Sequence, residues 1–209
     1  MTPGTPATPP FDVVGLGVNA LDLIAIIDGY PQPDTKVQFQ VFDVQGGGVT
    51  ATALTACARL GLRARYIGKV GGDFWPRVDL LVCNPRFLGA VTREGGIEDG
   101  LRALTEAGPC RVAVTLAAEG VLGFTEGRFI RVPGFPITPV DTNGAGDTFH
   151  GACAVGELRG WPFEWTLTFA NAVAAMKCRF LGGRRGIPRP PEVAEFLAAH
   201  GHQELAAAL

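Results

Sequence analysis

The residues best suited to chemistry lie in one short stretch, DTNGAGDTFHGA, which spans Asp141–Ala152. Gly144, Ala145 and Gly146 precede Asp147, and the residues that follow are typical of a helix. Backbone N–H groups at a helix N-terminus are unpaired and partly positive, and glycines let an anion approach them closely. A carboxylate beside them can accept a proton from an attacking hydroxyl. These parts suit phosphoryl transfer, although a capped helix with glycines that only permit close packing has the same short pattern.

The full string D-T-x-G-A-G-D-T-F-x-G-A resembles the C-terminal signature of the ribokinase-like sugar kinases, the PfkB carbohydrate kinase family. The chain lacks G-x-x-x-x-G-K-[ST], so a P-loop is not the predicted phosphate cradle. The resemblance implies that Asp147 is the general base and that the N–H groups of Gly144, Ala145, Gly146 and Asp147 form an anion hole. Asp141 would organise the loop, in a region that helps to hold a monovalent cation in the family.

The acceptor side of the resemblance lies near the N-terminus. The string G-V-N-A-L-D, which ends at Asp22, looks like the family's first strand with the aspartate that holds sugar hydroxyls. Gly47 and Gly48 are similar to the glycine pair beside the sugar, and Thr52 stands where an asparagine is common. The competing interpretations are a turn residue for Asp22 and a plain turn before a helix for the glycines.

The nucleotide side would come from later segments. Asn84 matches the start of an N-x-x-E motif, and the segment from Thr115 to Gly120 resembles a T-x-G-x-x-G nucleotide loop. Asn171 lies in the late helix that flanks the base, and Gly183 in the loop that closes that side. Asn171 could equally bond a neighbouring helix.

The elements that must position these residues alternate along the chain, which favours a mostly parallel sheet covered by helices. The resemblance makes this a truncated three-layer ribokinase-like α/β sandwich over residues 11–209, with a small β lid from about 21–45 and a disordered tail at 1–10. Strands are predicted at 11–17, 21–27, 36–42, 65–70, 78–83, 111–116, 121–124 and 129–132, and helices at 49–60, 97–108, 145–158, 163–178 and from about 191.

Three departures from the family pattern stand out. A long central block is absent, because Gly71-Gly72-Asp73 leads within a few residues to the strand at 78–83. The N-x-x-E motif is Asn84-Pro85-Arg86-Phe87, without its glutamate, and Ala117 replaces a glycine of the nucleotide loop. Magnesium, which typically keeps several waters, would then be held through ATP phosphates.

Composition narrows the function classes further. The net charge is −2 and no basic stripe is present, so nucleic-acid or membrane partners are not expected. No apolar run reaches the length of a membrane span, and the five cysteines favour buried thiols in a reducing cytoplasm over disulfides or metal ligands. His150, three positions after Asp147, is predicted to be a packed or surface side chain.

The resemblance as a whole implies ATP- and Mg²⁺-dependent phosphorylation of a small sugar. The strings F-H-G-A, A-x-K-C and G-G-R-x-G-I-P are most similar to the branch with sulfofructose and other ketose kinases. Lid-to-lid homodimers would follow if the lid is complete. The alternative is a non-catalytic remnant that binds nucleotide or a partner, for which the absent block is the motive.

Overall fold

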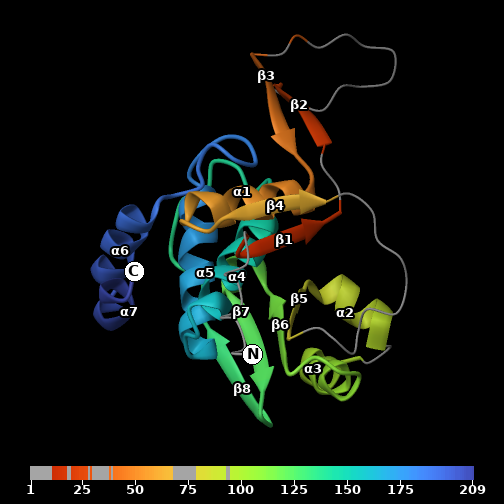
Figure 1. Cartoon of the computed structure of the whole chain (residues 1–209). Helices are drawn as coiled ribbons and strands as arrows, with labels where there is room; N and C mark the ends of the chain where they lie inside the picture. Colours follow the sequence, from red (N-terminus) through yellow and green to blue (C-terminus); the bar gives the residue numbers. More distant parts are fainter. Residues whose placement is uncertain are drawn as a thin grey trace, which may run out of the picture.

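The computed structural model describes residues 11–17, 20–27, 29, 38, 40–67, 79–92 and 95–209. Within these residues, a four-stranded sheet lies between two layers of helices, and strands from the first third of the chain form two smaller sheets (Figure 1). The predicted tail at 1–10 and the Gly71-Gly72-Asp73 segment lie outside the described residues.

The larger sheet has the order β5-β6-β7-β8. β5 (Leu80–Cys83) runs parallel to β6 (Arg111–Thr115), while β7 (Val121–Thr125) and β8 (Arg128–Val132) continue antiparallel as the predicted hairpin. The two faces of β6 alternate: Val112 and Val114 belong to one apolar cluster and Ala113 to the other. A sheet buried on both faces is the core expected of an α/β protein.

Each face of this sheet has its own helices (Figure 1). The cluster on one side includes α2 (Pro85–Thr92) and α3 (Ile97–Glu106). The larger cluster on the other side is built from α4 (Ala145–Leu158), α5 (Phe163–Lys177), α6 (Pro190–Ala199) and α7 (Gln203–Ala207). The three-layer α/β architecture is therefore confirmed.

A second, separate sheet pairs β1 (Val13–Leu16) in parallel with β4 (Ala64–Ile67). α1 (Val49–Arg59) packs on one face so closely that a Cβ at Gly15 would lie 2.7 Å from Leu54. On the opposite face Val14 is 49% exposed and Leu16 41% exposed. Because parallel sheets are normally covered on both faces, this pair is the incomplete part of the described fold.

The third sheet is the antiparallel pair of β2 (Ala20–Ile26) and β3 (Val41–Gly47), which projects from the body (Figure 1). This pair corresponds to the small β lid of the predicted fold. The strand predicted at 36–42 is described only from Val41 and runs on through Gly46 and Gly47. These glycines are strand residues rather than a turn, because β3 pairs with β2 as far as Gly47 and Gly48 then starts α1.

The helix bounds predicted at 145–158 and 163–178 match α4 and α5 to within one residue. Two short helices, α2 and α7, were not predicted. The start of α2 was interpreted as a family motif, yet Asn84 Oδ1 accepts the N–H of Phe87 at 2.8 Å and so caps this helix. All five cysteines are free, but Cys110 is exposed rather than buried.

Candidate functional site

The candidate site is centred on the N-terminus of α4. Gly144 is the N-cap residue with φ 73°, and a Cβ there would lie 2.8 Å from the carbonyl oxygen of Gly183. The Gly144 carbonyl accepts both the N–H and the hydroxyl of Thr148, at 2.9 and 2.8 Å. The left-handed φ and the close contact both require glycine, so the helix starts at a fixed place.

The hydrogen bonds of this turn show which donors can face a ligand. The N–H of Ala145 donates to the carbonyl of Thr142 at 3.1 Å, so Ala145 is not a free member of the predicted anion hole. Within the described part of the chain, the N–H groups of Gly144, Gly146 and Asp147 have no protein acceptor. A Cβ at Gly146 would have no atom within 4 Å, so open space lies in front of this turn.

Asp147 lies on the first turn of α4, partly buried. Burial raises the pKa of its carboxyl, His150 opposes the rise, and the negative charge of Asp22 adds to it. Asp22 therefore lies close enough to act on Asp147, although 125 residues separate them in the sequence. A raised pKa makes a carboxylate a better proton acceptor near neutral pH.

Asp22 is placed by β2, beside the strand that carries Gly47. A Cβ built on Gly47 would overlap the Asp22 carboxylate, and Gly47 therefore leaves the space that this carboxylate occupies. Gly48 is the N-cap of α1 with φ 87°. Thr52 is buried, with 1% exposure, and its hydroxyl lies 3.5 Å from Arg184 Nε, so it stands behind Arg184 rather than open to a ligand.

Two loops brace the N-terminus of α4 from behind. The Asp141 carboxylate accepts the N–H of Asn143 at 2.9 Å and the N–H of Gly182 at 2.7 Å. Burial raises the pKa of Asp141, but these two bonds and the charge of Lys177 outweigh it and leave the pKa lowered. The position of Asp141 is that of a loop organiser, and Gly183 lies against Gly144 in the same contact.

The residues predicted for the nucleotide side are engaged in the fold. Thr115 donates its hydroxyl to the carbonyl of Cys83 at 3.3 Å, and Asn84 caps α2. Gly120 has φ 97°, and a Cβ there would lie 2.1 Å from the carbonyl oxygen of Val132. Asn171, 9% exposed, donates to the carbonyls of Val132 and Pro133, which favours the interpretation that it bonds a neighbouring element.

Three residues near the site were not assigned to it from the sequence. Arg184 Nη2 donates to the carbonyl of Gly47 at 2.8 Å, and its guanidinium lies against Gly46. The ring nitrogens of His150 lie 2.6 Å from the Gly146 carbonyl and 3.1 Å from that of Val82, which ties α4 to β5. Lys177 is the third, and its Nζ donates to the carbonyl of Asp141 at 2.9 Å. The arginine pair after Gly182-Gly183 is a sequence feature that could have pointed to Arg184. The spacing of residues along α4 offers no such feature for His150.

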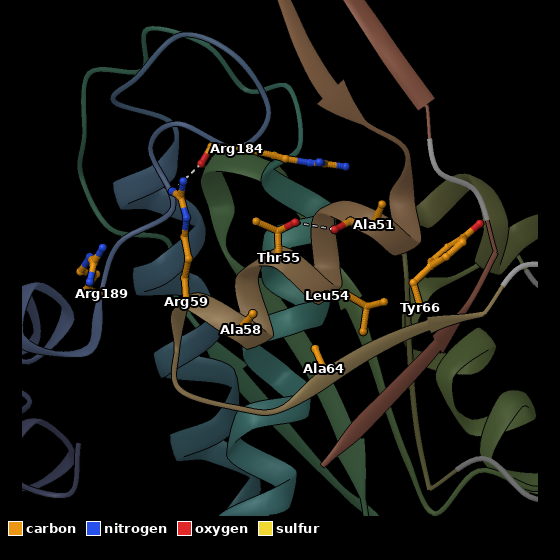
Figure 2. A pocket seen from close by; sticks show the side chains of 9 residues that line it. All are labelled: Ala51, Leu54, Thr55, Ala58, Arg59, Ala64, Tyr66, Arg184 and Arg189. Atoms are coloured by element: carbon orange, nitrogen blue, oxygen red, sulfur yellow. Dashed lines mark hydrogen bonds between the residues drawn. The ribbon is translucent and has the colours of Figure 1, made fainter. Parts of the chain in front are cut away.

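A groove beside α1 shares Arg184 with this site (Figure 2). It lies between α1 and β4, with Tyr66 at one end, Arg59 and Arg189 at the other, and the Arg184 side chain above α1. Arg59 donates to the carbonyl of Arg184 at 2.7 Å and so fixes the loop from outside. No carboxylate lines the groove, so it offers no base for a transfer reaction.

The described residues contain no group of three or more His, Cys, Asp or Glu side chains that could hold a metal ion. At the N-x-x-E position, Asn84 caps a helix and Phe87 replaces the carboxylate, so the side chains there do not form a magnesium site. Among the described helices, none combines the length and the apolar character required to cross a bilayer.

Comparison with solved structures identifies the fold. The ribokinase of Thermotoga maritima superposes with a TM-score of 0.74 at 19% identity, covering 90% of this chain and 99% of that chain. The Arabidopsis thaliana ribokinase complexed with ribose and ATP gives a TM-score of 0.73 at 18% identity, covering 90% of this chain and 98% of that chain. The chain is thus an α/β protein with the ribokinase fold.

Comparison at the sequence level identifies the family. Residues 73–190, more than half of the chain, match the pfkB family carbohydrate kinase. The chain belongs to this family. The ribokinase of Bacillus subtilis (strain 168) is 38% identical over 90 residues, which cover 43% of this chain and 31% of that protein. The matched part is thus about a third of the length of that relative.

Proposed function

We propose that the chain binds ATP and transfers its γ-phosphoryl group to a hydroxyl of a small sugar. Asp147 takes the proton of the attacking hydroxyl, the sugar oxygen bonds to the γ-phosphorus, and the bond from that phosphorus to the bridging oxygen of ADP breaks. The N–H groups of Gly144, Gly146 and Asp147 donate to the oxygens of the transferring group. Asp22 accepts hydrogen bonds from other hydroxyls of the sugar.

One observation carries the proposal: a half-buried carboxylate with a raised pKa stands on the same helix turn as N–H groups that have no protein acceptor. A second carboxylate, Asp22, lies within electrostatic reach from the N-terminal half. Family membership and the Arabidopsis ribokinase structure, which is a complex with ribose and ATP, support the choice of ATP. Because Asp22 lies near enough to act on the charge of Asp147, we expect the acceptor to bind between them.

The proposal also includes the substrate class, the metal ion, the cellular location and the oligomeric state. The substrate is a ketose or a related carbohydrate, and Mg²⁺ arrives with the ATP phosphates, since the chain offers no carboxylate at the N-x-x-E position. Thr115, Gly120 and Gly183 shape the nucleotide side through the loops they hold, and the reaction takes place in the cytoplasm. A homodimer through the β2–β3 pair would cover the exposed Val41 and Phe42 of that pair.

A non-catalytic remnant is the second candidate, and one observation favours it. The β1–β4 pair is separate from the larger sheet and has an exposed apolar face, so the acceptor half is less complete than the α4 half. Such a chain would bind nucleotide at the N-terminus of α4 without transferring phosphate.

The decisive experiment compares wild type with Asp147→Asn and Gly146→Ala. Thermal unfolding with and without Mg·ATP measures nucleotide binding, and ADP release across a panel of sugars measures transfer. Asp147→Asn should keep the Mg·ATP shift and lose about 10²–10⁴-fold in turnover, the usual contribution of a general base. The acidic limb of the wild-type pH–rate profile should lie above the ordinary carboxyl pKa of 3.8, because ionised Asp147 is the active form.

Gly146→Ala isolates the anion hole. The added methyl group meets no protein atom within 4 Å, so the fold should tolerate it, and helix propensity should even improve. If phosphate approaches this turn, the added methyl group should obstruct it although the N–H of residue 146 is kept, and the variant should bind Mg·ATP at least about tenfold more weakly, which corresponds to about 1.4 kcal/mol. Equal ADP release by wild type and Asp147→Asn contradicts the catalytic role, while Mg·ATP binding without turnover on any sugar supports the remnant.

A further inference from the structure

Lys177 is the buried charged side chain that the proposed reaction does not use. It lies in the last turn of α5, and its exposure is 0%. A buried ammonium is unfavourable unless nearby groups compensate its charge. The question is therefore what this cation does inside the fold.

The contacts of Lys177 lead directly to the catalytic turn. Its Nζ donates to the carbonyl oxygen of Asp141 at 2.9 Å, and the Asp141 carboxylate stabilises its charge. Burial lowers the pKa of Lys177, and the charge of Asp141 opposes that change. The C-terminal end of a helix, where Lys177 lies, also favours a positive charge.

The segment held by Lys177 is the one that places the anion hole. The N–H groups of Val140 and Asp141 donate to the carbonyl of Cys178, at 2.8 and 3.1 Å. The Asp141 carboxylate accepts the N–H groups of Asn143 and Gly182, so Asp141 joins the segments 140–143 and 178–183. Gly144, the residue after Asn143, packs against Gly183, and α4 begins at the next residue.

We propose that the Lys177 ammonium is an internal cation, a positioning residue that holds the 140–143 and 178–183 segments together and thereby sets the anion hole. This inference rests on the proposed function, since the turn it positions is the proposed phosphate site. A site lined by a backbone carbonyl and a carboxylate also suits a free monovalent cation. The chain would therefore need no such ion, because its own side chain supplies the charge.

The test removes the ammonium and offers a cation in its place. Lys177→Ala opens space for an ion, while Lys177→Met keeps the volume of the side chain without its charge. Both are compared with wild type in tetramethylammonium chloride, whose cation is too large to occupy the space, and in potassium or ammonium chloride at the same ionic strength. Leu167→Ala, a buried change on the same helix, is the matched control for general destabilisation.

In tetramethylammonium chloride, Lys177→Ala should bind Mg·ATP at least about tenfold more weakly than wild type, the size of one lost charged contact. Potassium or ammonium should restore most of that affinity and raise the unfolding temperature of Lys177→Ala. Wild type and Leu167→Ala should respond equally to all three salts. Lys177→Met should be weak in every salt, because its side chain fills the space.

Three results would overturn the inference: unchanged Mg·ATP affinity in Lys177→Met, a loss in Lys177→Ala that no small cation reverses, or cation dependence of wild type itself. If Lys177→Ala does not fold in any salt, Lys177→Met decides the question alone. The unfolding temperature also separates this inference from the proposed function. If wild type does not bind Mg·ATP, the kinase proposal fails, yet a salt-specific rise in the stability of Lys177→Ala would still support the internal cation.

Discussion

The two ends of the candidate site come from regions of very different completeness. The region around α4 and α5 has a continuous apolar cluster that includes the sheet and four helices. The region around β1, β4 and the β2–β3 pair consists of two-stranded sheets, with Val14, Leu16, Val41 and Phe42 all more than 40% exposed. The phosphate end of the site is thus supported by a packed core, whereas the acceptor end depends on small sheets.

The unequal packing of the two regions predicts which part of the site tolerates change better. Gly144, Gly146 and Asp147 lie in the complete region, where Asp141 and Gly183 hold them, and α1 supports the same region through Arg59. Asp22 and Gly47 belong to the projecting pair, which the loop at Arg184 and Arg185 ties to the body through hydrogen bonds to Gly47 and Asp43. Nucleotide binding should therefore be more robust to change than acceptor binding.

The largest difference between the two regions is expected for a pair of side-chain substitutions, Phe169→Ala and Leu16→Ala. Phe169 is wholly buried and packs edge-on against Trp161 with ring centroids 5.3 Å apart, so its loss should cost about 3–5 kcal/mol of unfolding free energy. Leu16 is 41% exposed, so its loss should cost no more than about 1 kcal/mol. Urea unfolding measures both, and Phe169→Leu serves as the milder variant. Similar losses at the two positions would show that the regions are equally well packed.

A medium effect should separate the two glycines that meet behind the anion hole. Gly144→Ala places a Cβ at φ 73° and 2.8 Å from the Gly183 carbonyl, which should cost about 1–2 kcal/mol or more. At Gly183 the nearest atom to an added Cβ is Asn143 Nδ2 at 3.8 Å, so Gly183→Ala should change stability by less than about 0.5 kcal/mol. Thermal unfolding of the two variants checks the order. A costly Gly183→Ala with a neutral Gly144→Ala would contradict the described contact.

The smallest effect is expected in the loop where Ala117 stands in place of a family glycine. Ala117 has φ 53°, a conformation that costs an alanine about 1 kcal/mol. Ala117→Gly should raise stability by no more than about 0.5 kcal/mol, because the greater freedom of glycine in the unfolded chain offsets about 0.4–1 kcal/mol of the relieved strain. Ala118→Gly, in the same short turn, is the control and should lower stability by about 0.5–1 kcal/mol. A lower unfolding temperature for Ala117→Gly would show that this backbone is not strained.

Much of the fold could be predicted because its signals are local. The bounds of α4 and α5, the β7–β8 hairpin and the stop of α1 at Gly61 follow from apolar periodicity and glycine positions. The short helix α2 could not be predicted, because its first turn overlaps the segment 84–87, which resembles the N-x-x-E motif of the family. β3 was misplaced toward its N-terminal side because strand pairing with β2, not the alternation of side chains alone, decides where it ends.

For the site, the chemical groups could be predicted from the sequence: a base, backbone donors and a second carboxylate, each in a motif whose residue types fit its role. These signals are local, since a glycine, an aspartate and a helix start lie within a few residues of one another. Which of these groups come together depends on the folded chain. It brought Asp22 within reach of Asp147, used the N–H of Ala145 within the turn, and buried Lys177 against Asp141. Such contacts join segments far apart in the chain, and electrostatic and hydrogen-bonding partners depend on distance in space rather than separation in sequence.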